Sequence, residues 1–443
     1  MRTTRIGCGA GFSGDRIDPA VELAARGSIA YLVFECLAER TIALAQKARL
    51  LDPAAGYDPL LEERMEAVLP LCAEKQIRIV SNMGAANPAA AATKTRDIAR
   101  RLGIAGLRVA AVSGDDVLSV LRNDHPSLLH GHLARLPAVK IVSANAYLGA
   151  APIAEALAGG ADVVLTGRIA DPSMFVGILM HEFGWPMDGW NLLGQGTVVG
   201  HLLECAGQLT GGYFADPGYN DVPGLARLGF PIAEVAEDGT AMFSRVEGSG
   251  GIINRATCTE QLLYEIQDPS AYLTPDVVAD FSHVTVEEAG ADRIRVCGGR
   301  GKPRPDTLKV SVGYHDGYVG EGQISYAGPG ALARARLARD ILAERLRGKE
   351  LTQLRFDFIG INAILGDRLS SGRPEPYEVR LRAAGRSDTW RAASMIAREV
   401  EALYTNGPAS GGGVTGSTRE TVGILPALIP RSLVETTLHY EVS

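Results

Sequence analysis

Short apolar runs alternate with stretches of helical pattern from residue 4 to about residue 175. The runs cover about residues 4–8, 29–36, 77–82, 107–112, 139–147 and 162–167. Each run ends in a small or polar cluster, and Asp18-Pro19 and Gly27 mark the start and end of the first expected helix. About six β/α units in succession predict an α/β fold, a parallel sheet with helices on both faces. Ligands of such sheets bind outside the carboxyl ends of the strands, so these polar clusters should converge on one crevice.

The pattern changes along the second half of the chain. A long middle region, about residues 174–280, contains an expected helix near residues 200–209. Beyond it we expect strands near residues 282–290, 292–299 and 307–318, then a helix over 331–346, strands over 354–365 and 377–383, and a helix over 389–405. This order predicts two domains, an N-terminal α/β domain over residues 1–280 and a C-terminal α+β domain over residues 281–443.

Composition narrows the class of protein. The 443 residues are 46% hydrophobic and 21% charged, and 51 acidic against 44 basic residues give a net charge of −7. A globular protein fits these values, whereas nucleic-acid binding would need a basic stripe. There is neither an apolar run of about 18 residues nor a signal-peptide core, which favours a cytoplasmic location without a membrane partner. The six cysteines are scattered and form no CxxC pair, which argues against a disulfide framework or a zinc cage.

A glycine motif follows the first expected strand. Gly9, Gly11 and Gly14 spell GxGxxG, and Glu35 lies 21 residues beyond Gly14, as in a dinucleotide-binding fingerprint. However, the helix starts only at Asp18, and Asp15 would bring a carboxylate toward a pyrophosphate. We therefore favour a glycine-rich strand-to-helix turn, in which Gly11 and Ser13 approach the substrate, over a nicotinamide or flavin site.

Several long segments carry a resemblance to a known family. The segments are GCGAGFSGDR from residue 7, YLVFECLAERT from 31, VLTGRIADPS from 164, GHLLECAGQLTGGYFAD from 200 and EQLLYEIQDPSAYLTPDV from 260. Together they resemble the acyclic terpene utilisation (AtuA-like) family, from the first strand to beyond Tyr314. The resemblance implies a role in the catabolism of branched acyl-CoA intermediates. Some relatives occur beside or fused to a small partner domain, so a small partner subunit is one expectation.

Carboxylates at the end of the second strand are the first candidates for chemistry. Glu35 ends a strand that is apolar throughout, where burial raises a carboxyl pKa and suits a general acid or base. Asp15 in the neighbouring loop could be its partner. Glu39 follows four residues later, where we favour a charge in the first turn of a helix.

The turn after residue 165 is a candidate anion site. Thr166, Arg168 and Asp171 lie between the last strand and a helix that begins at Asp171-Pro172. Arg168 could bind a carboxylate or phosphate through its forked guanidinium, helped by the amides of the helix start. The alternative is an arginine that bridges loop carbonyl groups.

Amides follow two other strands. Asn82, with Asn87, and Asn145, with Tyr147, could bind a carboxylate or thioester oxygen and stabilise an enolate. Turn-forming asparagine is the competing interpretation.

His201, Glu204 and Cys205 share one helical face, at spacings of three and four residues. We interpret His201 as a proton carrier that Glu204 orients. We favour this interpretation over a metal site, because no remote third ligand is apparent. Ser249 and Gly250 lie in the cluster GSGG, which could hold a phosphate or act as a hinge. No cofactor is indicated, although a divalent metal stays open.

The leading hypothesis is a lyase-type enzyme, a hydratase, dehydratase or C–C lyase, that acts on a carboxylic acid or branched acyl-CoA. It would abstract a proton next to a carbonyl, with Glu35 or Asp15 as base, His201 as acid, and Arg168, Asn82 and Asn145 as substrate clamp. One alternative is a non-catalytic acyl-binding subunit with a small partner protein. Another is an NAD(P)-dependent oxidoreductase. We also expect a homo-oligomer.

Overall fold

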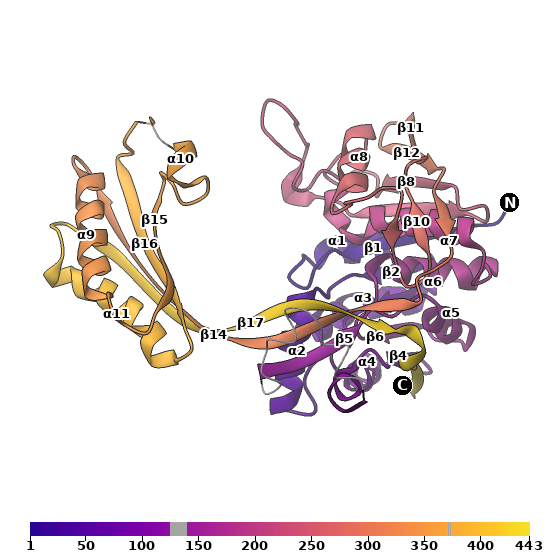
Figure 1. Ribbon diagram of the computed structural model, residues 1–443. Coiled ribbons are helices and arrows are strands. Elements are labelled where there is room, and N and C mark those ends of the chain that lie inside the picture. The colour runs from indigo at the N-terminus through magenta and orange to yellow at the C-terminus, as the bar shows by residue number, and fades with distance from the viewer. Residues whose placement is uncertain (125–139, 371, 373) are drawn as a thin grey trace. The chain divides into compact units, whose positions relative to one another are not determined.

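The chain forms two compact units. The computed structural model describes residues 1–124, 140–370, 372 and 374–443. Unit 1 comprises residues 1–313 and 424–443, and unit 2 comprises residues 314–423. The boundary expected at residue 280 lies inside unit 1, between strands β10 (Val278–Asp280) and β11 (Thr285–Gly290). The long strands β14 (Thr307–Ala327) and β17 (Gly412–Pro430) each run from one unit into the other (Figure 1).

A large mixed sheet forms the centre of unit 1. In the described part of the chain its order is β11-β12-β8-β7-β1-β2-β3-β6-β4-β18. The parallel strands are β1 (Thr3–Ala10), β2 (Tyr31–Phe34), β3 (Arg78–Ser81), β6 (Val163–Thr166) and β4 (Arg108–Ser113). Antiparallel strands extend them on both sides, namely β7 (Pro231–Ala236), β8 (Ala241–Arg245), β12 (Arg293–Cys297), β11 and β18 (Thr437–Val442). The parallel core therefore places the ends of β1, β2, β3, β4 and β6 at one edge.

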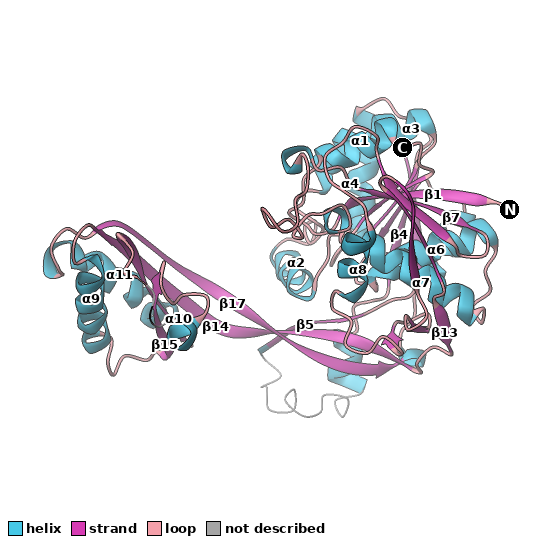
Figure 2. Ribbon diagram, turned by 90° about the horizontal axis from the view of Figure 1, so that it is seen from above, coloured by secondary structure: helices cyan, strands magenta, loops and turns pink. Residues whose placement is uncertain are grey.

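Helices cover both faces of this sheet (Figure 2), which confirms the predicted α/β class. One group of helices that pack together consists of α1 (Asp18–Arg26), α3 (Leu61–Lys75) and α4 (Pro88–Arg101). A second group consists of α5 (Ala151–Ala158), α6 (Asp171–Phe183) and α7 (Trp190–Glu204). Helices α2 (Glu39–Leu51) and α8 (Arg255–Leu263) complete the longer helices of the unit. Within the described ranges, no helix is long and apolar enough to cross a membrane.

One of the six expected strands does not join the parallel sheet. The apolar run over residues 139–147 forms β5 (Ile141–Ala146), which pairs with β14 instead of the central strands. Its buried residues Ile141, Ala144 and Ala146 pack with Val310 and Val312 in a separate small core. The expectation of six parallel strands was therefore wrong by one, because an apolar run does not encode its partner strand.

Helix α7 begins about ten residues earlier than expected and ends at Glu204. Nearly all of its residues from Leu193 onward are buried, since it packs between α6 and a small sheet of β13 (Arg300–Lys302), β10 and β9 (Tyr272–Leu273). Gly200 allows the close approach to α6, because a Cβ there would lie 2.8 Å from the Pro172 Cα. Burial on every side removes the amphipathic pattern that would have marked the helix.

Unit 2 is an α+β sandwich of a sheet and two helices. Its strand order is β15-β16-β14-β17, with β15 (Thr352–Ile359) and β16 (Glu378–Ser387). Along the chain, β14 and β15 flank helix α9 (Ala331–Arg345), while β16 and β17 flank α11 (Trp390–Asn406); short α10 (Gly366–Ser370) lies between the two halves. Two interleaved strand-helix-strand units of this kind form a ferredoxin-like topology. Ile324, Leu332, Leu381 and Ile396 belong to its core.

Candidate functional site

A cavity of about 900 Å³ lies in unit 1, where the loops after β1 and β2 meet the start of α6 and the end of α7. Its charged lining residues are Asp15, Arg16, Glu35, Glu39, Asp171, Glu204, Glu265 and Lys309. We call it the carboxylate cavity. Of the residues predicted from the sequence, Gly11, Asp15, Glu35 and Asp171 line it together with Glu204, so the strand-end rule brings these side chains to one place.

Glu35 lies directly after β2 and is 9% exposed. Its Oε1 accepts hydrogen bonds from the Leu37 amide at 2.8 Å and from Asn82 Nδ2 at 2.9 Å. Its Oε2 accepts no hydrogen bond from any described residue. Burial, followed by repulsion from Asp171, raises the pKa of Glu35 to about 8, although the Arg168 charge and the two hydrogen bonds oppose the rise. This carboxyl group is therefore mostly protonated at neutral pH and keeps one oxygen free.

Asn82 supports Glu35. The Asn82 side chain is fully buried, and its Oδ1 accepts a hydrogen bond from the Cys36 amide at 2.7 Å. With both ends of the amide used inside the protein, Asn82 fixes the rotamer of Glu35 and does not line the cavity.

Glu39 holds a tyrosine and a lysine at the cavity wall. Its Oε1 accepts hydrogen bonds from the Tyr147 hydroxyl at 2.6 Å and from Lys309 Nζ at 3.0 Å. Partial burial works against the charge, but these donors outweigh it and lower the pKa of Glu39 to about 2. Lys309 Nζ also lies 4.6 Å from the centre of the Tyr147 ring. Glu39 is thus ionised at neutral pH, four residues from a carboxyl group that is not.

Lys309 is, with Arg16 and Glu265, one of the charged cavity residues that the sequence did not predict. It lies on β14, 270 residues beyond Glu39, in a stretch that the sequence placed in the C-terminal domain. Its side chain is about half exposed and lines the carboxylate cavity. The stretch TLKVSV carries no motif that separates this lysine from a surface lysine, so only the pairing of β5 with β14 reveals it.

Arg168 is buried behind the cavity wall. Its guanidinium donates to the Ile169 carbonyl at 2.7 and 2.9 Å, to the Leu37 carbonyl and to Asp171 Oδ1, and it lies 4.3 Å from the Tyr147 ring centre. Burial raises the pKa of Asp171, while the Arg168 charge opposes that rise. Arg168 is not among the lining residues, so its guanidinium holds the loops that carry Asp171 and Tyr147.

His201 and Glu204 form a buried pair at the end of α7. His201 Nδ1 lies 2.8 Å from Glu204 Oε1, and the two residues are 1% and 8% exposed. Burial raises the pKa of Glu204 to about 7, and His201 limits the rise. Glu204 lines the cavity, whereas His201 lies behind it in a cluster with the rings of Tyr272 and Phe281. The sequence predicted that His201 carries the proton and that Glu204 orients it. In the structure Glu204 is the residue at the cavity, and His201 lies behind it.

The glycine-rich loop after β1 is held by Asp15 of the loop itself and by Arg64 of helix α3. Asp15 Oδ2 accepts from the Gly11 amide at 3.0 Å, and Arg64 Nη2 donates to the Ser13 carbonyl at 2.7 Å. A Cβ at Gly11 would lie 2.6 Å from the backbone carbon of Cys205. Close packing against α7 thus accounts for Gly11. Of the two loop residues expected at the substrate, Gly11 lines the cavity and Ser13 does not.

Four other predicted residues lie away from the carboxylate cavity. Thr166 is fully buried and donates to the Gly167 carbonyl, and Asn145 donates to Asp115 Oδ2 at 2.8 Å. Ser249 Oγ donates to the Val246 carbonyl, and the Gly250 amide donates to the Arg227 carbonyl at 2.7 Å. These groups are used in hydrogen bonds inside the protein, and none of the four residues lines the cavity.

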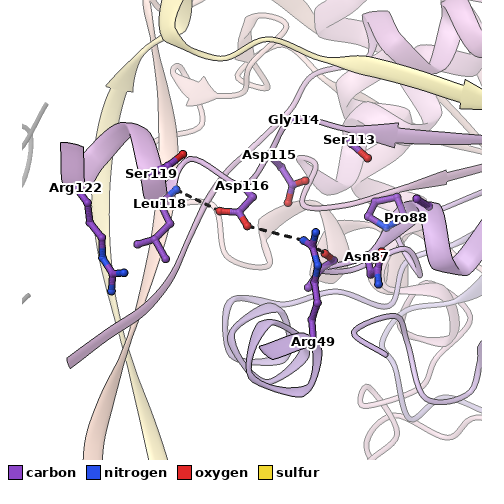
Figure 3. A pocket seen from close by; sticks show the side chains of 12 residues that line it. Arg49, Asn87, Pro88, Ser113, Gly114, Asp115, Asp116, Leu118, Ser119 and Arg122 are labelled. Carbon is purple, nitrogen blue, oxygen red and sulfur yellow. Dashed lines mark hydrogen bonds and ion pairs between the residues drawn. The ribbon is translucent and has the colours of Figure 1, made fainter. Parts of the chain in front are cut away.

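A second cavity, of about 620 Å³, lies beside the start of α4 (Figure 3). We call it the α4 cavity. Arg49, Asp115, Asp116 and Arg122 are its charged lining residues, and Asn87 caps α4 by accepting from the Ala90 amide. Arg49 reaches Asp116 Oδ2 at 4.0 Å, and burial raises the pKa of Asp115 to about 6. Among the residues that the structure describes, no group of three or more His, Cys, Asp or Glu side chains is arranged to hold a metal ion.

Comparison with known proteins gives one match. The family model described as acyclic terpene utilisation family protein AtuA matches residues 4–440. No curated protein and no solved structure matches the chain. The matched range covers both units and every residue of the carboxylate cavity. The chain therefore belongs to the acyclic terpene utilisation (AtuA) family and is a protein related to terpene utilisation.

Proposed function

We propose that the chain is a lyase-type enzyme that adds or removes water, or cleaves a C–C bond, next to the carbonyl of a carboxylic acid or branched acyl-CoA. One observation carries this proposal. Glu35 keeps a free oxygen at the cavity and has a pKa of about 8, which lies near the operating pH of a cell. A carboxyl group of this kind can both give and take a proton at carbon.

Lys309 completes the chemistry. Removing a proton next to a carbonyl places negative charge on the carbonyl oxygen, and a cation beside that oxygen stabilises the resulting enolate. Glu39 and Tyr147 both interact with Lys309, and because Nζ carries three donors, at least one is left for a ligand. Lys309 takes the place of Arg168 as the cation nearest the substrate, because the Arg168 guanidinium is used inside the protein.

Apolar side chains give the cavity room for a hydrocarbon skeleton. Phe12, Leu37, Phe230, Leu308 and Leu428 line it, along with the charged groups. Most ligand pockets combine an apolar wall with a few polar groups that fix orientation. This division supports a substrate with a carbonyl end and a branched apolar end.

The test separates proton abstraction from the complete reaction. Purified full-length protein is incubated with butyryl-CoA in D₂O, and ¹H NMR follows exchange of the protons next to the carbonyl. Crotonyl-CoA, tiglyl-CoA and the free acids are followed by loss of enoyl absorbance. We expect exchange and hydration in the wild type, loss of both in Glu35→Gln, and no change in Glu22→Gln, whose carboxylate pairs with Arg26 at the surface. Absence of both reactions with every compound would contradict the proposal.

A further inference from the structure

The buried pair at the end of α7 leaves two polar atoms without partners. Neither His201 Nε2 nor Glu204 Oε2 forms a hydrogen bond with any described residue, although both atoms are buried. Buried polar groups are satisfied in nearly all proteins, and exceptions often mark reactive groups. Glu204 lines the same cavity as Glu35, so this unsatisfied pair lies at the wall of the proposed active site.

The surroundings of the pair hold it in place. Tyr272 and Phe281 lie on the His201 ring at centroid distances of 5.7 and 5.6 Å. Gln261 Nε2 donates to the His201 carbonyl at 2.9 Å, which ties the end of α7 to α8. The imidazole therefore has a fixed position relative to Glu204, with Nδ1 toward the carboxyl group and Nε2 in a dry environment.

The charge state of the pair follows from its burial. A buried ion without a partner is costly, so the pair is most stable with zero net charge, which requires one exchangeable proton between the two groups. That proton can lie on Glu204 with a neutral imidazole, or on His201 with a carboxylate. The other titratable groups that interact with Glu204 are Asp171 at the start of α6, Glu265 after α8, Tyr272 in β9 and Cys205. Glu35 lines the same cavity. Asp171 and Glu265 disfavour a negative charge on Glu204 by electrostatic repulsion.

We propose that Glu204 is the catalytic residue that exchanges a proton with water, and that His201 is the positioning residue that stabilises the Glu204 carboxylate. In hydration, Glu204 takes a proton from water as the water oxygen bonds to the β-carbon. The C=C electron pair takes a proton from Glu35 at the α-carbon, so the proton lost by Glu35 equals the one gained by Glu204. The reverse sequence removes water. This inference rests on the proposed function and assigns the partner of Glu35.

The chain offers a matched control pair. His439 and Glu441 on β18 also form a His–Glu contact, with Nε2 3.2 Å from Oε1, but the His439 side chain is 62% exposed. His439→Asn should leave all of the readouts below unchanged, because water solvates the His439 imidazole and neither residue of the pair lines the carboxylate cavity.

Two measurements on the full-length chain test the inference. Infrared spectroscopy follows the C=O stretch of protonated carboxyl groups against pH, with Glu204→Gln identifying the Glu204 band. We expect Glu204 to titrate near pH 7 and to titrate higher in His201→Asn, because the histidine lowers its pKa. Titration of Glu204 near pH 4, or no shift in His201→Asn, would overturn the shared proton.

The second measurement separates Glu204 from Glu35. Butyryl-CoA carries no hydroxyl group, so its proton exchange in D₂O needs Glu35 but not Glu204. We expect Glu204→Gln to keep this exchange and to lose about 10²-fold or more of crotonyl-CoA hydration. His201→Asn should hydrate more slowly, with its pH profile shifted upward, while His439→Asn matches the wild type.

The outcomes distinguish the two proposals. If the wild type hydrates crotonyl-CoA and Glu204→Gln hydrates it equally fast, the role of Glu204 is overturned and the proposed function stands. If the wild type neither exchanges nor hydrates, the proposed function is overturned, and with it the catalytic role of Glu204. The infrared titration then still decides whether the pair holds a shared proton.

Discussion

The two cavities of unit 1 differ in how their charges are balanced. Among the described residues, six acidic and two basic side chains line the carboxylate cavity, whereas two of each line the α4 cavity. In the α4 cavity Asp116 approaches Arg49 and accepts from the Leu118 amide (Figure 3). In the carboxylate cavity Glu35 and Glu204 are buried, and burial raises their pKa values to about 8 and about 7. A buried carboxyl group with a pKa near neutrality can supply an exchangeable proton, and the carboxylate cavity has two such groups whereas the α4 cavity has Asp115, with a pKa of about 6.

The largest expected effect comes from removing one of these protons. Glu35→Gln should lower α-proton exchange by about 10²–10⁴-fold, the usual contribution of a general acid or base. Asp116→Asn in the α4 cavity should leave the rate unchanged, because the partners of the Asp116 side chain are Gln46, Arg49 and the Leu118 amide, and none of these residues lines the carboxylate cavity. The NMR exchange assay measures both. Equal losses in the two variants would mean that both cavities serve the same reaction.

The second-largest difference between the two cavities should be in the free energy of unfolding that is lost when an arginine beside each cavity is removed. Arg64 is fully buried, bonds Asp58 at 3.2 Å, and holds the carbonyl groups of the loop beside the carboxylate cavity. Arg64→Ala should lower the free energy of unfolding by about 3–5 kcal/mol, because Asp58 keeps a buried charge without a partner. Arg49→Ala in the α4 cavity should cost less than about 1 kcal/mol, since Arg49 is 44% exposed. Urea titrations of both variants check the difference, and a similar loss in each would refute it.

The sequence predicts the carboxylate cavity better than it predicts its cation. Glu35, Asp15 and Asp171 follow strands of the parallel sheet, and the strand-end rule needs no knowledge of strand partners. Lys309 depends on β14, which reaches the cavity only through its pairing with β5. An apolar run records that a strand is buried but does not record which strand lies beside it. Residues on strands that pair over long separations are therefore the ones that sequence patterns miss.

The glycines teach a similar lesson. Gly11 and Gly250 both suggest a backbone that approaches a ligand, yet only Gly11 lines the carboxylate cavity. A Cβ at Gly250 would lie 2.0 Å from the Gly224 carbonyl oxygen, so chain packing alone requires glycine there. Packing against Cys205 requires glycine at Gly11 as well. A glycine packed beside a cavity and one packed away from it look the same in sequence, because both reflect the missing side chain.

The pH dependence of stability should differ between Glu35 and Asp115. Both have raised pKa values, about 8 and about 6, so the folded state binds their protons more tightly than the unfolded state does. Stability then falls as pH rises from the ordinary carboxyl range, about 4, to the folded pKa, and is level above it. In the wild type the contribution of Glu35 to stability decreases up to about pH 8, and Glu35→Gln removes this decrease. The contribution of Asp115 decreases only up to about pH 6, and Asp115→Asn removes that decrease.

Urea unfolding at pH 5, 6.5 and 8.5 distinguishes these two windows. Relative to wild type, Glu35→Gln should gain about 4 kcal/mol between pH 5 and 8.5, with about half of the gain above pH 6.5. Asp115→Asn should gain less, and mostly below pH 6.5. An effect of Glu35→Gln that does not vary with pH would show that Glu35 has an ordinary pKa.

The smallest expected effect concerns backbone strain at the carboxylate cavity. Tyr213 lines this cavity at a φ of +63° and is 94% exposed, whereas no non-glycine residue that lines the α4 cavity has a positive φ. A left-handed conformation costs a side-chain-bearing residue about 1–2 kcal/mol, and glycine avoids that cost but loses about 0.5–1 kcal/mol to the unfolded chain. Tyr213→Gly should therefore gain about 0.5 kcal/mol. Tyr219 supplies the control, since it is 87% exposed in the same loop without a positive φ. Tyr219→Gly should lose about 0.5–1 kcal/mol of stability. A higher melting temperature for Tyr213→Gly and a lower one for Tyr219→Gly would establish backbone strain at Tyr213, whereas equal decreases would contradict it.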